Sequence, residues 1–122
     1  MSGLEWVVEA WGCNAAVLRE QSALQALFDS LIEDLRLRPV SPPLWHKFAG
    51  AGGLTGLCLL SESHLTCHTF PEHASLCLNL FSCVPRAEWD FERELRARFG
   101  ATRVQVRSLV RSYTSCREEI AT

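Results

Sequence analysis

Three apolar segments joined by very short connections constrain the fold of this chain more than any other feature. Residues 54–60, 64–70 and 75–83 each have the length and the apolar content of a β-strand. Connections this short join antiparallel neighbours, because parallel strands need a long crossover. The sequence therefore predicts an antiparallel meander, with Glu62 and Ser63 at its first junction.

Further elements are predicted on both sides of the meander. Strands are expected over residues 4–11, 45–48 and 102–110. One helix is expected from an N-cap at Asn14 to about Leu37, because its apolar residues recur every three or four positions. A second helix is expected from about Ala87 to Phe99, with Gly100 at its end.

This order of elements predicts the fold class. Two helices can cover only one face of an antiparallel sheet, so we expect an α/β (α+β) two-layer sandwich. The second face of the sheet needs a cover as well. We therefore expect a homodimer, the commonest way for a chain to cover such a face.

Composition excludes several classes of function. A chain of 122 residues fits one domain, and its net charge of −2 provides no basic field for nucleic acid or an anionic membrane. No apolar stretch approaches the roughly 20 residues that span a bilayer. The first residues lack the features of a signal peptide. We therefore expect a cytoplasmic protein without nucleic-acid or membrane partners.

The six cysteines indicate neither a disulfide scaffold nor a metal site. No Cys-x-x-Cys pair occurs, and no export signal points to an oxidising compartment. The spacing of the nearby histidines and cysteines also matches no common zinc pattern. Three cysteines fall inside apolar runs and are expected to be buried, reduced thiols: Cys58, Cys67 and Cys77.

Ser63 has two possible roles at the first junction of the meander. It can be an ordinary turn residue, or its hydroxyl can attack the carbonyl of Glu62 if the turn is strained. The resulting ester breaks by β-elimination, and hydrolysis leaves a pyruvoyl group on the second fragment. His68 is suited to removing the proton that this elimination requires. Because a spacing of five puts Ser63 and His68 on opposite faces of a regular strand, we expect a bend or bulge near His64.

A family resemblance supports the second role. The chain resembles the prokaryotic S-adenosylmethionine decarboxylase proenzyme, which is pyruvoyl-dependent, from Leu4 to about Val110. The segments that carry the resemblance are Ser61-Glu62-Ser63-His64-Leu65-Thr66, His68-Thr69, Pro71-Glu72 and Phe81-Ser82-Cys83.

The resemblance implies a single domain, residues 1–122, that cuts itself between Glu62 and Ser63 into a β chain (1–62) and an α chain (63–122). Ser63 becomes the covalent pyruvoyl cofactor. His68 is the proton acceptor in processing, Cys83 is the proton donor in decarboxylation, and Thr55 stands where the family usually has a processing serine. A dimer of processed units, with active sites at the interface, is also implied.

The reaction implied is the decarboxylation of S-adenosylmethionine for spermidine biosynthesis, through a Schiff base and without a metal. Phe48, Phe70 and Glu72 are candidates for the substrate pocket, since aromatic faces suit an adenine ring or a sulfonium. A plain core or turn role is the alternative for each. Because Phe70 replaces the usual tryptophan and Asn79 the usual aspartate, ornithine or arginine is an alternative substrate. A non-catalytic regulatory relative is a further alternative.

Overall fold

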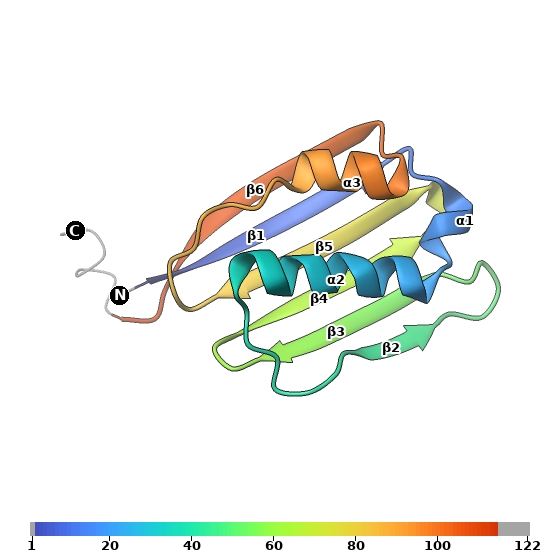
Figure 1. Ribbon diagram of the computed structural model, residues 1–122. Coiled ribbons are helices and arrows are strands. Elements are labelled where there is room, and N and C mark those ends of the chain that lie inside the picture. Colours follow the sequence, from blue (N-terminus) through green and yellow to red (C-terminus); the bar gives the residue numbers. More distant parts are fainter. Residues whose placement is uncertain (1, 115–122) are drawn as a thin grey trace.

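A six-stranded sheet forms one layer of the protein, and helices form the other (Figure 1). The computed structural model describes residues 2–114. The spatial order of the strands is β2-β3-β4-β5-β1-β6, and every neighbouring pair is antiparallel. The predicted α+β two-layer fold and the meander β3-β4-β5 are thus confirmed. The strands are β1 (Ser2–Trp11), β2 (Leu44–Lys47), β3 (Leu54–Leu60), β4 (Ser63–Phe70), β5 (Ser75–Ser82) and β6 (Arg103–Ser112).

The predicted single helix after Asn14 is wrong, because the segment forms two helices, α1 (Ala15–Leu18) and α2 (Gln21–Leu35). Asn14 is the expected N-cap, and its side chain accepts hydrogen bonds from two backbone N–H groups of α1. The helix is interrupted at Glu20, whose backbone is extended. The Leu18 carbonyl accepts from the buried Thr69 hydroxyl at 2.8 Å, so tertiary structure supplies the partner at this break.

The helix that follows the meander is shorter than predicted, and a loop takes up the difference. Helix α3 (Phe91–Phe99) begins after Asp90, whose side chain accepts from the Arg93 N–H at 3.1 Å as an N-cap. Gly100 ends the helix in the left-handed conformation, as expected. Residues 83–90, including Cys83, therefore form an irregular connection between β5 and α3.

The hydrophobic core lies between the helices and the sheet. Alternate residues of each central strand point into it, as Trp6, Val8 and Ala10 of β1 do. Cys58 and Cys67 are buried in this core as predicted, whereas Cys77 is only half-buried because it lies on the other face of the sheet. Cys116 lies outside the described residues. Within residues 2–114, no helix is long and apolar enough to cross a membrane.

The second face of the sheet, here called the open face, is covered by none of the helices formed by residues 2–114 (Figure 1). Leu57 and Leu59 of β3 lie on it and are 44% and 55% exposed. A short 3-10 helix, η1 (Pro71–His73), connects β4 to β5 at one end of the sheet.

Thr69→Val is expected to lower the free energy of unfolding by roughly 2–4 kcal/mol. The Thr69 hydroxyl accepts from the Leu54 N–H at 2.9 Å and donates to the Leu18 carbonyl, so valine leaves two buried backbone groups unpaired. Urea denaturation measures the loss, with each variant made in a Ser63→Ala background to exclude the self-cleavage that the sequence predicts. Thr102→Val is the matched control, since Thr102 is exposed. Equal losses in the two variants would contradict the interpretation.

Candidate active site

A tight turn holds the predicted cleavage position. Leu60 and Ser63 are directly opposite on β3 and β4, so Ser61 and Glu62 form a two-residue hairpin turn. Ser63 is the half-buried first residue of β4, and it also lies opposite Ser82 on β5. The register of the meander therefore brings the end of β5 to the turn.

A backbone hydrogen bond connects Cys83 to the predicted scissile peptide. The Cys83 N–H donates to the Glu62 carbonyl oxygen at 3.2 Å. On the other side of Cys83, the Tyr113 hydroxyl donates to its carbonyl oxygen at 3.1 Å. A donor fixed on a carbonyl oxygen stabilises the negative charge that a nucleophile creates there. The geometry thus suits addition of a nucleophile to the Glu62 carbonyl carbon.

Thr55 and His68 form a second group on the open face. They lie opposite each other on β3 and β4, and Thr55 Oγ1 is 3.0 Å from His68 Nδ1. If Nδ1 carries the proton and donates to Thr55, then Nε2 of the exposed His68 ring is free to accept a proton. This pair can therefore supply a base whose orientation is fixed by the threonine.

The bulge predicted near His64 is wrong. Strand β4 pairs without interruption with both β3 and β5 from Ser63 to His68. Ser63 therefore lies on the helix side of the sheet, opposite the buried Ser82, and His68 lies on the open face. Five residues of strand separate them by about 16 Å. A single chain does not bring the two side chains together.

The remaining predicted residues lie at the His68 end of the sheet. Phe70 ends β4, Glu72 follows in η1, and Phe48 comes directly after β2. Phe48 and Glu72 are exposed, and Phe70 is half-buried. The predicted site residues thus form two half-sites at opposite ends of the sheet. The cleavage half-site contains Glu62, Ser63 and Cys83; the histidine half-site contains Thr55, His68, Phe48, Phe70 and Glu72.

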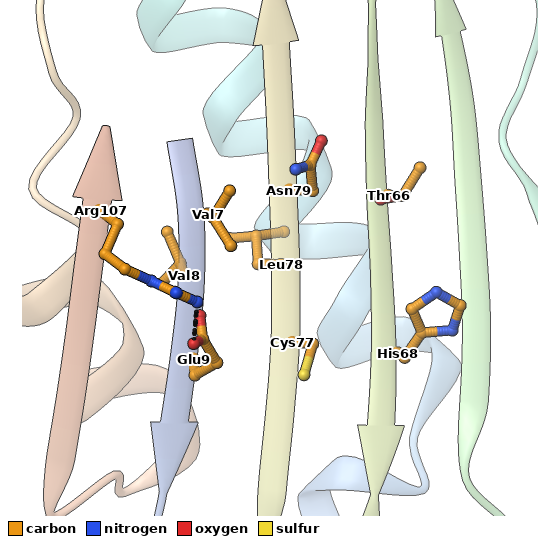
Figure 2. Close-up of a pocket in the computed structure, with 9 residues that line it drawn as sticks. All are labelled: Val7, Val8, Glu9, Thr66, His68, Cys77, Leu78, Asn79 and Arg107. Atoms are coloured by element: carbon orange, nitrogen blue, oxygen red, sulfur yellow. Dashed lines mark hydrogen bonds and ion pairs between the residues drawn. The ribbon is translucent and has the colours of Figure 1, made fainter. Parts of the chain in front are cut away.

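A hollow of about 320 Å³ crosses the open face next to His68 (Figure 2). Cys77 lies directly opposite His68 on β5, and Glu9 lies opposite Cys77 on β1. Cys77 was expected to be buried in the core, but its alternation along β5 with the buried Leu76 and Leu78 places it on the open face. The hollow is lined by Val7, Val8, Glu9, Thr66, His68, Cys77, Leu78, Asn79 and Arg107.

Charged pairs cross the open face along β1. Arg107 forms an ion pair with Glu9, as Figure 2 shows, and Arg111 forms one with Glu5. The Asn79 side chain donates to Glu5 at 2.7 Å, and this bond, together with Arg111, lowers the pKa of Glu5. Glu9 Oε2 and Asn79 Oδ1 are buried without a partner among the described residues. The open face therefore keeps acceptors that a covering layer can satisfy.

Cys67 on the helix side of the sheet and Cys77 on the open face both have a thiol with a raised pKa. Burial raises the pKa of Cys67 to about 12, and burial together with the Glu9 carboxylate raises the pKa of Cys77. Both thiols therefore stay protonated at neutral pH. In the part of the chain that the structure describes, no three histidine, cysteine or acidic side chains are grouped so that they could hold a metal ion.

Comparison with known proteins identifies the family of the chain. The sequence model of the S-adenosylmethionine decarboxylase family matches residues 4–112. The chain belongs to this family. The resemblance noted in the sequence is thus confirmed for nearly the whole chain.

Individual members of the S-adenosylmethionine decarboxylase family give the degree of similarity. The chain is 33% identical over 112 residues to the S-adenosylmethionine decarboxylase proenzyme of Shouchella clausii, with 89% of this chain and 84% of that protein aligned. It is 34% identical over 88 residues to proenzyme 2 of Halalkalibacterium halodurans, with 70% of this chain but only 66% of that protein aligned. The crystal structure of the adenosylmethionine decarboxylase from Aquifex aeolicus has the same fold, with a TM-score of 0.75, 19% identity and 94% of each chain covered.

Proposed function

We propose that the protein is a pyruvoyl-dependent S-adenosylmethionine decarboxylase that first cuts itself between Glu62 and Ser63. The observation that carries the proposal is the hydrogen bond from the Cys83 N–H to the Glu62 carbonyl, at a turn that Ser63 immediately follows. The names of the two bacterial relatives, both proenzymes of this decarboxylase, support it.

Self-cleavage uses the groups at the turn. The Ser63 hydroxyl oxygen adds to the Glu62 carbonyl carbon, and the charge that develops on the carbonyl oxygen meets the Cys83 N–H. The C–N bond then breaks, the nitrogen takes a proton, and an ester replaces the amide. Removal of the Ser63 α-proton breaks the bond between Cβ and the ester oxygen, which leaves Glu62 as a carboxylate and residue 63 as dehydroalanine. One water then releases the nitrogen as ammonia and leaves a ketone.

The residues present fit a pyruvoyl group at position 63. Ser63 is the first residue of β4, so a cut before it produces a new chain end without removing any strand pairing. Once formed, the pyruvoyl group supplies a ketone that condenses with a substrate amine and accepts the electrons released as CO₂ leaves. Cys83, beside the cut, is the residue that returns a proton to the product carbon.

A homodimer completes the site in this proposal. The cleavage half-site and the histidine half-site lie at opposite ends of one sheet, so His68 of the same chain is out of reach of Ser63. Two sheets that face each other around a two-fold axis can bring the strand end that carries the Glu62–Ser63 peptide of one copy to the strand end that carries His68 of the second copy. Because the Ser63 side chain lies on the helix side, it is the main chain at this strand end that the second copy would reach. The exposed leucines and the unpaired acceptors of the open face support such a cover.

The histidine half-site also suggests where the substrate binds. Phe48 and Phe70 offer aromatic faces for an adenine ring or a sulfonium, and the exposed Glu72 carboxylate can accept hydrogen bonds from hydroxyl groups. These features favour S-adenosylmethionine over ornithine or arginine, because a basic amino acid has no ring to stack. The substrate therefore lies between the half-sites of two chains.

The purified wild-type protein is expected to contain two fragments, residues 1–62 and 63–122, and Ser63→Ala a single intact chain. Intact mass distinguishes the two states, and borohydride reduction of the second fragment detects the ketone. Ser61→Ala is the matched control, since Ser61 lies in the same turn and should be cut normally. An unaltered serine at position 63 in mature wild-type protein would refute the enzymatic function and favour the non-catalytic alternative.

The mature protein is expected to release CO₂ from S-adenosylmethionine and not from ornithine or arginine. Cys83→Ala keeps the backbone N–H, so the variant should still cut itself but turn over roughly 10²–10⁴-fold more slowly. Cys13→Ala, which removes a buried thiol of the core instead of the half-buried thiol at the turn, is the control. Normal turnover of Cys83→Ala would show that this thiol is not the proton donor. Release of CO₂ from ornithine or arginine, and not from S-adenosylmethionine, would show that the substrate is a basic amino acid.

Co-expression of Ser63→Ala with His68→Ala chains is expected to restore cleavage of the His68→Ala chain alone. A mixed dimer contains one complete site, made of Ser63 from one chain and His68 from the other. Mass spectrometry of the mixture identifies which chain is cut. The control pairs His68→Ala with the double variant, which should give no cleavage. Failure of the first mixture to cleave would contradict a site shared between two chains.

A further inference from the structure

The loop that carries Cys83 is anchored to the C-terminal end of α2. Arg86 Nη1 donates to the Leu35 carbonyl oxygen, and Trp89 Nε1 donates to Asp34 at 2.8 Å. The last carbonyl groups of a helix have no partner within the helix and carry its negative pole. A guanidinium group at this point therefore satisfies an otherwise unpaired carbonyl and connects the loop to the helix layer.

The same guanidinium group also reaches the strand residue opposite Ser63. Arg86 Nε donates to Ser82 Oγ at 3.1 Å, and the Ser82 hydroxyl donates to the Val84 carbonyl at 2.8 Å. Because an arginine side chain only donates, Ser82 must accept from it, and its single proton is committed to Val84. Ser82 is fully buried. These bonds hold the backbone on both sides of Cys83.

We infer that Arg86 is a positioning residue for self-cleavage, acting through Ser82 on the Cys83 backbone. The inference rests on the proposed function. The bond from the Cys83 N–H to the Glu62 carbonyl is 3.2 Å, at the long end of the normal range, so a small movement of residues 82–84 breaks it. Arg86 opposes that movement because it bonds both α2 and Ser82.

A matched arginine separates this role from general stability. Arg98 is half-buried like Arg86, and its Nη2 donates to the Ser30 hydroxyl of α2 at 2.7 Å. Its Nε donates to Glu94 at 2.9 Å, on the same helix. Arg98 thus also connects an element to α2 through a serine, but it touches none of the residues around the Glu62–Ser63 turn.

The test measures the rate of cleavage during cell-free synthesis, in which newly made chains are still uncut. Arg86→Ala is expected to slow the appearance of the two fragments roughly ten- to a hundredfold, the size of effect that misplacement of a reacting group produces. Arg86→Lys keeps the positive charge at the helix end but cannot reproduce both bonds, so it should be intermediate. Arg98→Ala should cut at the wild-type rate, even if it lowers the Tm by as much as Arg86→Ala does.

A double variant tests the route through Ser82. Ser82→Ala removes both bonds of the hydroxyl, so Arg86→Ala combined with Ser82→Ala should cut no more slowly than the slower single variant. After prolonged incubation, mature Arg86→Ala enzyme should have a lower kcat with an unchanged KM, because the misplaced residue is Cys83. Ser82→Ala and Arg86→Lys keep the test decisive if Arg86→Ala does not fold.

The outcomes distinguish this inference from the proposed function. Wild-type protein that stays uncut refutes the proposed function, and it thereby also refutes a role of Arg86 in self-cleavage. Cleavage of Arg86→Ala at the wild-type rate refutes only the role of Arg86. Slowing of Arg98→Ala by the same factor, or multiplicative slowing in the double variant, would show that the effect is general destabilisation and would also overturn the inference.

Discussion

The hydrogen bond between the Cys83 N–H and the Glu62 carbonyl depends on the register of the β3-β4-β5 meander. Leu60, Ser63 and Ser82 align across the three strands, and this alignment places the end of β5 at the hairpin turn. A shift by one residue would turn every buried side chain of β4 toward the open face. The buried Leu65 and Leu80 also lie opposite each other. By holding the register, they fix the position of Cys83 relative to the turn as well as the packing of the core.

How much of the protein could be predicted from its sequence depended on the range of the interactions involved. The meander and the role of Asn14 follow from local patterns, and both are present in the structure. The break at Glu20 could not be predicted, because it depends on a hydroxyl group 51 positions away in sequence, that of Thr69 on the Leu18 carbonyl. The bulge near His64 was expected because a spacing of five puts Ser63 and His68 on opposite faces of a regular strand, and β4 is such a regular strand. The location of Cys77 on the open face could have been predicted from the sequence, because residues of β5 alternate between the two faces of the sheet.

The rigidity of the sheet is the physical reason for proposing that a second chain completes the two half-sites. An uninterrupted strand between Ser63 and His68 is paired on both sides, so no local bend can shorten their separation of about 16 Å. The open face has features of an interface, namely exposed leucines on β3, ion pairs between β1 and β6, and buried acceptors without a partner among the described residues. These two facts support the proposed active site made of two chains, in which assembly would precede the elimination step assigned to His68.

Strand order also explains how the sheet could stay intact after the proposed cut between Glu62 and Ser63. The fragment before the cut contains β1, β2 and β3, and the fragment after it contains β4, β5 and β6. In the sheet, β1 lies between β5 and β6, so the two fragments alternate and neither forms the sheet alone. Strands β3 and β4 also stay paired from Thr55 and His68 to Leu60 and Ser63 without the turn. The proposed cleavage would therefore remove the constraint at position 63 while the surrounding hydrogen bonds keep the new chain end in place.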